Sequence, residues 1–212
     1  MAPVVPDPKA IKAFKTEAAF EAWLRVNHAR VTEIWLRIYK KRSGRPTITP
    51  AQALDVVLCW GWIDGVRKPF DDESFLQRYT PRRARSIWSQ NNQEHVARLT
   101  KAGRMQPSGH KQIEAAKADG RWHNAYAPMR HASAATIPDD LRAAIAANPR
   151  AQQTFDTLDR QNLFSLAFRT NNMKTPDGRA RKIASLVETL ARGETIVTRR
   201  PPRSRASLKK PR

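Results

Sequence analysis

One segment, residues 51–63, constrains the fold of this chain most, because it is apolar on nearly every side. Asp55 is its only charged residue before Asp64. A helix with so little polar surface has to be buried on most sides, so other elements must pack around it. The preceding residues 49–52 read Thr-Pro-Ala-Gln, which supplies an N-cap, a proline at the first helical position and the partner of a capping box. The sequence therefore predicts a central buried helix over residues 51–63, with Gly65 as its stop.

Three strands and another helix are predicted around this segment. Residues 16–28 carry apolar side chains at helical spacing. Residues 31–41 alternate between an apolar face and an aromatic, basic face, as in a half-buried strand. Residues 66–70 and 75–80 flank an Asp-Asp-Glu-Ser turn, which is typical of a hairpin. The order helix, strand, helix, strand, strand predicts a small antiparallel sheet that packs against the helices.

Helical patterns continue toward the C-terminus in two groups, which an aperiodic stretch separates. The first group covers residues 90–101 and 108–118, and the second covers residues 137–147, 151–158, 162–168 and 179–191. We therefore predict an α+β fold, a small antiparallel sheet packed with helices, followed by a C-terminal helical module. The predicted divisions are a disordered arm at residues 1–13, an α+β core at 14–123, a linker at 124–137, the helical module at 138–195 and a disordered basic tail at 196–212.

The charge of the chain is strongly positive, +20 over 212 residues, and part of the excess lies at the C-terminus. Residues 199–212 contain seven Lys or Arg and no acidic residue. Such a tail attracts polyanions such as nucleic acid without sequence preference, in a salt-dependent way. It is also consistent with a general basic bias that only aids solubility, and the sequence leaves both interpretations open.

Cysteine, histidine and hydropathy patterns narrow the class of protein. The single cysteine, Cys59, excludes an internal disulfide and a cysteine-based metal cluster. The five histidines have no metal-binding spacing, and no phosphate-binding or dinucleotide-binding loop occurs, so we expect no metal and no cofactor. No apolar stretch has the length of a membrane span, and no signal peptide is evident. A cytoplasmic protein without a membrane span is the expectation.

The candidate site centres on Asp64, which follows an apolar run and needs a partner if it is buried. At the C-terminus of the predicted helix it would face the negative end of the helix dipole. The residues Thr80 and Pro81 open a short helical or turn segment with a second Thr-Pro start, and as a helix start its backbone N–H groups would face the same place. We predict one ligand-binding pocket here for a small anionic or polar molecule, formed by Trp60, Trp62, Asp64, Arg82, Arg83, Ser86, Trp88 and Asn91. A structural ion pair that only fixes the helix remains the alternative.

Two other interpretations use different residues or a different chemistry. Trp35, Arg37 and Tyr39 share one face of the first predicted strand, where they are suited to stacking on nucleic-acid bases. They are equally suited to covering that face of the sheet. Alternatively, Asp64 acts as a general base in an enzyme. We expect a binding protein rather than an enzyme, with nucleic acid bound nonspecifically by the basic tail; the oligomeric state stays open.

Several short motifs together resemble one known family. They are residues 34–36 (Ile-Trp-Leu), 59–65 (Cys-Trp-Gly-Trp-Ile-Asp-Gly), 79–83 (Tyr-Thr-Pro-Arg-Arg), 86–89 (Ser-Ile-Trp-Ser) with Asn91, 103–105 (Gly-Arg-Met) and 116–122 (Ala-Lys-Ala-Asp-Gly-Arg-Trp). With these motifs the chain resembles the YdeI/OmpD-associated (OmdA-like) family, bacterial proteins often labelled bacteriocin-protection proteins. The resemblance covers roughly residues 14–195. In the C-terminal module only Arg179, Arg181 and Lys182 keep the family's pattern.

The resemblance implies a general role and no specific chemistry. It suggests a cytoplasmic protein of stress response, which protects against bacteriocins or other cationic peptides. No reaction, cofactor or catalytic residue carries over with it. A protein of the cytoplasm cannot block an extracellular toxin directly, so the protection it implies is indirect or regulatory.

Overall fold

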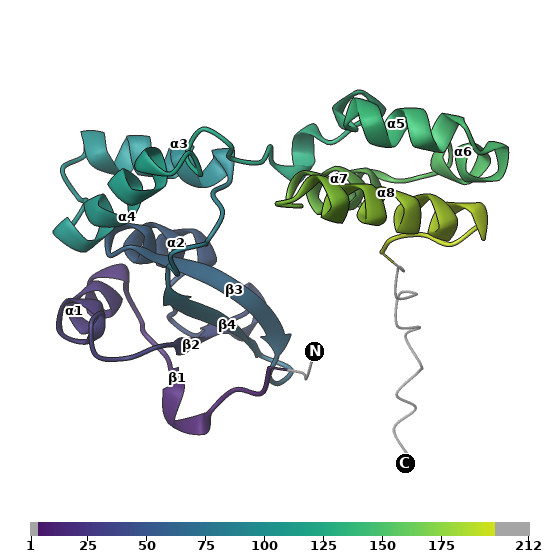
Figure 1. Cartoon of the computed structure of the whole chain (residues 1–212). Coiled ribbons are helices and arrows are strands. Elements are labelled where there is room, and N and C mark those ends of the chain that lie inside the picture. Colours follow the sequence, from purple (N-terminus) through teal and green to yellow (C-terminus); the bar gives the residue numbers. More distant parts are fainter. Residues whose placement is uncertain (1–3, 198–212) are drawn as a thin grey trace, which may run out of the picture. The chain divides into compact units, whose positions relative to one another are not determined.

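The computed structural model describes residues 4–197, which form two compact units (Figure 1). The first unit ends at Tyr126 and the second begins at Ala127. Residues 1–3 and 198–212, which include nearly all of the predicted basic tail, lie outside the described residues. The α+β class is confirmed, because a sheet with helices forms the first unit and helices alone form the second (Figure 1).

The sheet has four strands in the spatial order β1-β2-β4-β3. Strands β2 (Ile34–Tyr39), β4 (Ser74–Pro81) and β3 (Trp62–Pro69) are antiparallel neighbours, as predicted. The short strand β1 (Ile11–Lys12) adds a parallel pair with β2, so the sheet is mixed rather than purely antiparallel. With the 3₁₀ helix Pro8–Ala10, this strand orders part of the segment for which the sequence predicts a disordered arm.

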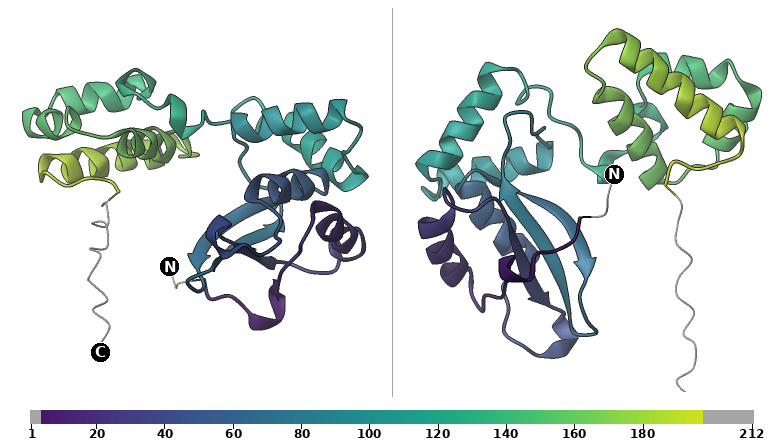
Figure 2. Two further views of the ribbon diagram at one scale, coloured as in Figure 1. Left: turned by 180° about the vertical axis from the view of Figure 1, so that it is seen from behind. Right: turned by 60° about the horizontal axis from the view of Figure 1, so that its bottom comes forward.

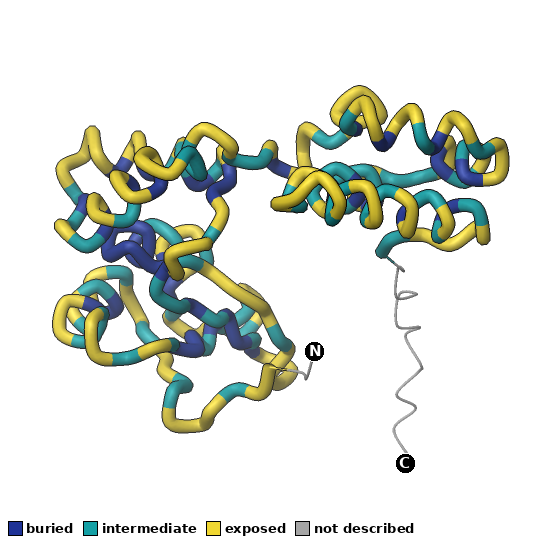
Figure 3. Tube along the Cα trace, in the orientation of Figure 1, coloured by how far each residue is buried: buried dark blue, intermediate teal, exposed yellow. Residues whose placement is uncertain are grey.

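The central buried helix is confirmed as α2 (Pro50–Cys59). Its capping box forms: the Gln52 amide donates to Thr49 Oγ1 at 3.3 Å, and the Thr49 amide donates to Gln52 Oε1 at 3.0 Å. Figure 3 shows the tube of α2 as the most continuously buried part of the first unit. The helix ends at Cys59, four residues before the predicted Ile63, because Gly61 turns the chain with a φ of 75° into strand β3.

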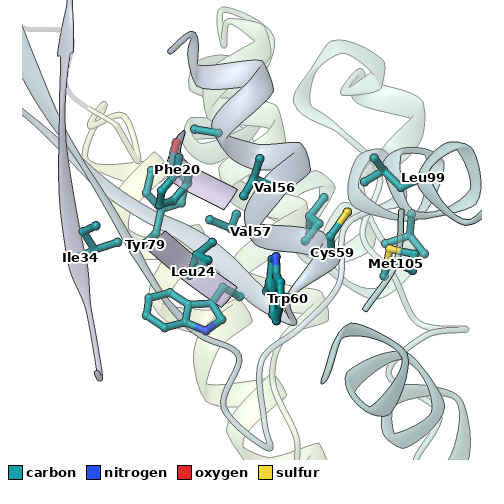
Figure 4. Close-up of a cluster of buried hydrophobic side chains, with 14 of the residues drawn as sticks. Phe20, Leu24, Ile34, Val56, Val57, Cys59, Trp60, Tyr79, Leu99 and Met105 are labelled. Atoms are coloured by element: carbon teal, nitrogen blue, oxygen red, sulfur yellow. The ribbon is translucent and has the colours of Figure 1, made fainter. Parts of the chain in front are cut away.

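Helix α2 lies between two groups of elements, and this arrangement makes one continuous core. Helix α1 (Glu17–Asn27) and the sheet pack against one side of it, and α3 (Gln90–Lys101) and α4 (Pro107–Ala118) lie on the other, as the view from behind in Figure 2 also shows. In Figure 4, Val56 and Val57 face Phe20 and Tyr79, while Cys59 lies toward Met105.

The junction between α2 and α4 is closer than side chains normally allow. The carbonyl oxygen of Cys59 accepts a hydrogen bond from the Gln106 amide at 3.1 Å, and the Ser108 hydroxyl donates to the Trp60 carbonyl at 3.0 Å. A Cβ atom at Gly109 would overlap the Cys59 carbonyl oxygen, and one at Gly61 would lie 2.7 Å from the Ser108 carbonyl oxygen. Both glycines are therefore required by backbone contact between the helices.

The only charged side chain of α2 joins this helix to α3. Asp55 accepts hydrogen bonds from His95 Nδ1 at 2.8 Å and from Arg98 Nη2 at 2.7 Å. Desolvation by burial is the largest effect on the Asp55 carboxyl and acts to raise its pKa, but the hydrogen bonds from Arg98 and His95 together outweigh it and lower the pKa below 3.8. The ionised carboxylate is therefore part of the packing of α2 on α3.

We expect Asp55→Asn to destabilise the first unit by about 1–2 kcal/mol at pH 7, because it weakens two charge-assisted hydrogen bonds. Since the folded-state pKa is depressed, this stability is present above the unfolded value of 3.8 and is lost as the pH falls through the folded value. Urea unfolding at pH 7 and at about pH 3 tests it. A cost that stays the same at both pH values would contradict the prediction, and the exposed Asp72→Asn serves as control.

The second unit is a bundle of four helices, α5 (Asp139–Ala146), α6 (Pro149–Phe155), α7 (Arg160–Asn171) and α8 (Pro176–Ala191). Each overlaps a predicted helix. They enclose a separate apolar core that includes Leu141, Leu166 and Leu190. Arg179 on α8 pairs with Asp140 on α5 at 2.5 Å and donates to the Thr170 carbonyl at 3.0 Å, which ties three of the helices together.

Candidate functional site

Asp64 lies on a strand and not at a helix C-terminus, so this prediction is wrong. Because α2 ends at Cys59, residues from Trp62 onward pair with β4, and Asp64 stands opposite Tyr79 in the register. The helix dipole therefore does not act on it as expected. Asp64 is solvent exposed, and no salt bridge within 4.0 Å reaches it among residues 4–197. The structural ion pair that the sequence left open is not formed at contact distance.

Arg82, by contrast, is almost completely buried, with 5% of its surface exposed. Its amide donates to the Gly61 carbonyl at 3.0 Å, which continues the pairing of β4 with the start of β3. The guanidinium carbon lies 3.4 Å from the centre of the Trp88 ring, and Nη1 donates to the Ile87 carbonyl at 3.2 Å. The other two nitrogens, Nε and Nη2, are buried and have no hydrogen-bond partner among residues 4–197.

The second Thr-Pro pair does not start a helix. Thr80 and Pro81 are the last residues of β4, where they pair with Ile63 and Trp62. A turn follows instead, in which the Ser86 amide donates to the Arg83 carbonyl at 2.9 Å. The backbone N–H groups expected from a helix start at Thr80 and Pro81 are therefore not presented there.

Burial dominates the electrostatics of Arg82 and its neighbours. Desolvation lowers the pKa of Arg82 to about 10, against a favourable effect of Asp64. Surrounding protein atoms also raise the pKa of Asp64, although its own backbone hydrogen bond, Arg82 and Arg67 act in the opposite direction. Because the Asp64 side chain is still exposed to solvent, its raised pKa reflects protein atoms packed around the carboxyl group. It does not indicate that Asp64 lies in the core. Asp64 and Arg82 therefore attract each other electrostatically, but they do not form a salt bridge.

We expect Asp64→Asn to stabilise the first unit slightly at pH 7, by a few tenths of a kcal/mol, since the carboxyl is exposed and solvent screens it. The folded-state pKa is raised, so the charged carboxylate costs stability at pH values above it, and this cost is relieved as the pH falls toward 3.8. Thermal unfolding of both proteins from pH 7 to about pH 4 measures the difference. A wild type that is more stable than Asp64→Asn at pH 7 would contradict the prediction.

Three residues that the sequence analysis did not select also belong to this neighbourhood. Desolvation raises the pKa of Tyr126, and its side chain hydrogen bonds to Ser89 and lies in the fields of Asp64 and Arg82. Arg121 donates to the Ser86 carbonyl at 2.9 Å and acts on Arg82 as a second positive charge. Trp122 packs edge-on against Trp88, with ring centres 4.8 Å apart. The motif at residues 116–122 was the only sequence signal for two of them.

The side chains and amides of the other predicted site residues make their contacts away from the Arg82 guanidinium. Trp62 is buried in the core, where its Nε1 donates to the His28 carbonyl at 3.2 Å. The Trp60 ring lies 4.6 Å from the His28 ring, and its buried Nε1 has no hydrogen-bond partner in the described part of the chain. Arg83 is exposed, and its amide donates to the Ser86 hydroxyl at 2.9 Å. Asn91 is half-buried in the first turn of α3. The structure thus brings together Asp64, Arg82 and Trp88 of the predicted set.

The proposed nucleic-acid face is largely occupied by the protein itself. Trp35 has no exposed surface, and its Nε1 donates to Glu33 at 3.3 Å. Arg37 pairs with Asp71 at 2.6 Å and donates to the Ser74 hydroxyl at 3.0 Å. Only Tyr39 of the three is partly available. Trp35 therefore covers the sheet, which was the structural alternative, and cannot stack on a base without leaving its place.

Within residues 4–197, no three His, Cys, Asp or Glu side chains gather closely enough to hold a metal ion. No helix of that range is both long and apolar enough to cross a membrane.

In the comparison with known proteins, family models match two separate stretches of the chain. Residues 12–112 match a domain of unknown function (DUF8412), which includes the Trp-Gly motif and most of the candidate site. Residues 134–193 match the family described as bacteriocin-protection, YdeI or OmpD-associated. Neither a curated protein nor a solved structure gave a significant match to the chain. The expected family is thus confirmed on the helical module, where few of its residues kept the expected pattern: the chain carries a C-terminal domain of the bacteriocin-protection, YdeI or OmpD-associated family.

Proposed function

We propose that this chain is a non-enzymatic binding protein of stress response that contributes to bacteriocin or cationic-peptide protection from the cytoplasm. Its C-terminal domain supports the general role through its family. Its N-terminal unit would hold a small anionic or polar ligand at Arg82. The observation that carries this second part is the pair of buried guanidinium nitrogens, Nε and Nη2, that lack a partner.

A buried cation without a counter-ion is costly, and protein folds rarely keep one without a reason. Stacking on Trp88 compensates only part of the cost, because a cation–π contact contributes about 2 kcal/mol even when desolvated. Arg121 adds a second positive charge near Arg82, and the carboxylate of Asp64 acts on Arg82 in the opposite direction. An anion bound to Nε and Nη2 would supply both the missing hydrogen bonds and the missing charge.

Both nitrogens are shielded from solvent, so access requires movement of the residues that cover them. Residues 83–87 are suited to this, because Arg83, Ala84, Arg85 and Ile87 are exposed and the segment is a turn without regular secondary structure. Their hold on the rest of the unit includes the hydrogen bond from Arg121 to the Ser86 carbonyl. We propose that this segment opens to admit the ligand.

Native mass spectrometry of freshly purified full-length protein tests the proposal directly. We expect the wild type to carry an adduct of small-molecule mass, and Arg82→Met to lose it. Arg85→Met is the matched control, because it removes the same charge from an exposed position of the same segment and should keep the adduct. A clean apo mass for the wild type, or an adduct that Arg82→Met retains, would overturn the assignment to Arg82.

An enzymatic role for Asp64 is the second candidate, and its raised pKa is the observation in favour of it. A general base at this position would make the protective phenotype of the cell depend on Asp64 itself. Cells that carry Asp64→Asn in place of the wild type should then lose protection. If they keep full protection with a folded protein, Asp64 does not act as a base.

A further inference from the structure

A second site of the first unit lies apart from Arg82, at the end of the sheet where α2 begins. It is a surface pocket of about 580 Å³. The end of β2, residues 40–49 with the start of α2, and residues of β3 and β4 line it. Of its lining residues, only Arg67 also acts on the Arg82 neighbourhood, through its charge near Asp64. Its volume falls within the range of small-molecule sites in proteins, which is about 300–1,000 Å³.

The walls of this pocket combine aromatic rings with an apolar floor. Tyr39 and Phe75 supply the rings, and the buried side chains of Ile38 and Ile48 supply the floor. Both rings already have guanidinium groups over them: the guanidinium carbons of Arg37 and Arg45 lie 4.8 Å and 5.1 Å from the Tyr39 ring centre. That of Arg67 lies 4.4 Å from the Phe75 ring centre. A flat ring of a ligand could stack on Tyr39 or Phe75 in place of one of these guanidinium groups, which would then be displaced toward the rest of the ligand.

The charge of the lining has one sign. It contains four cations, Lys40, Lys41, Arg45 and Arg67, and no acidic side chain. The N-terminal end of α2, at Thr49 and Pro50, adds the positive end of a helix dipole.

Two of these cations are largely committed to neighbouring groups. Lys40 donates to the carbonyl oxygens of Asp71 and Asp72, and Arg45 pairs with Glu73 at 3.3 Å. Arg67 uses Nε for Gln77 at 3.0 Å, which leaves both of its Nη groups for another acceptor. The Lys41 side chain makes no hydrogen bond or ion pair with any residue in the range 4–197, although its backbone carbonyl accepts a hydrogen bond from the Gly44 amide at 3.4 Å. Lys41 and Arg67 are therefore the cations that remain for a ligand.

From this combination we propose that the pocket binds a nucleoside phosphate. The base would stack against Tyr39 and Phe75, and the phosphates would lie between Lys41 and Arg67, where ammonium and guanidinium groups can donate to several oxygens at once. A concave site of this size accommodates one such molecule and not a duplex. The proposal is independent of the Arg82 site, so either can fail alone.

Titration calorimetry of the full chain with ATP, at about 0.15 M salt, tests this proposal. We expect saturable binding with one site, and binding at least about tenfold weaker for the double variant Lys41→Gln/Arg67→Gln. The matched control is Lys101→Gln/Lys111→Gln, which removes two positive charges from exposed positions on α3 and α4 and should bind within about twofold of the wild type. Both variants keep the basic tail, so nonspecific attraction is equal.

A second titration separates the base from the phosphates. Inorganic tripolyphosphate should bind about tenfold more weakly than ATP, because it cannot stack on the rings. Equal affinities for the two ligands would overturn the stacking part of the proposal. Absence of saturable ATP binding, or equal loss of binding in the two double variants, would overturn the site itself. Unchanged tryptophan emission confirms that each variant is folded, since all six tryptophans lie in the first unit.

Discussion

Replacing Gly109 with alanine should destabilise the first unit by about 3 kcal/mol, the upper end of the usual cost of overpacking. The added methyl group would overlap the Cys59 carbonyl oxygen and lie 3.0 Å from its carbon and 2.9 Å from the end of the Met105 side chain. The methionine can move, but the Cys59 carbonyl cannot, because it accepts the hydrogen bond from the Gln106 amide. Helix α4 would have to shift away from α2 along the whole junction.

Two further glycines separate the cost of contact from the cost of backbone conformation. Gly103→Ala places a methyl group in open space at a φ of 65°, so it should cost only about 1 kcal/mol. Gly61→Ala combines a φ of 75° with a close approach to Ser108, and should cost at least as much as Gly109→Ala. Urea unfolding followed by tryptophan emission reports this unit alone. A Gly109→Ala protein as stable as Gly103→Ala would show that the junction yields easily.

Replacing Arg82 with methionine should stabilise the ligand-free first unit by about 1 kcal/mol and abolish ligand binding. The shift of the Arg82 pKa from 12.5 to about 10 corresponds to a folded-state cost of about 3 kcal/mol. Loss of the contact with Trp88 offsets about 2 kcal/mol of this gain. Because the pKa is depressed, the cost is present at every pH below about 10 and is relieved only as the pH rises above it. The gain should therefore not vary between pH 6 and pH 9.

Arg121→Met is the comparison, and its effect should have the opposite sign. Arg121 holds Asp119 at 2.7 Å and the Ser86 carbonyl at 2.9 Å, so its loss should cost about 1–2 kcal/mol. Thermal unfolding of the three proteins in one buffer gives both values. If Arg82→Met were as destabilising as Arg121→Met, the Arg82 guanidinium would be a structural element, and the energetic argument for a ligand would fail.

The sequence predicted the elements of this fold better than their ends. The apolar character of residues 51–63 correctly indicated a buried helix, but Trp60, Trp62 and Ile63 suit a buried strand as well as a buried helix. Only the turn at Gly61 decides between them, and it depends on the packing of α4, which is distant in sequence. The error in the position of Asp64 follows from this.

The two Thr-Pro pairs show the same limit of local signals. At residues 49–50 the pair starts α2, and at residues 80–81 it ends β4. The dipeptide is identical, and the difference lies in the partner: Thr80 and Pro81 pair with Ile63 and Trp62 of a strand that exists only because α2 stops early. Proline tolerates the end of a strand as well as the start of a helix.

For the candidate site, the residues on the hairpin were predictable and those from farther along the chain were not. Asp64, Arg82 and Trp88 lie within one short stretch of sequence, and their grouping was expected. Tyr126 reaches them through backbone hydrogen bonds with Trp88 and Gln90, from a segment that was predicted to be a linker. No periodic pattern marks that contact, because a single bridge between distant residues leaves no repeat in the sequence.

Because Cys59 is buried where α2 meets α4, chemical labelling of its thiol can report how often this junction opens. The thiol has no exposed surface, and desolvation raises its pKa to about 11, so a thiol reagent cannot modify it while α2 and α4 stay together. It is also the only cysteine of the chain. The rate at which a reagent labels Cys59 therefore equals the rate, or reports the equilibrium, of separation at this one junction. The same thiol would register any ligand that holds the first unit closed.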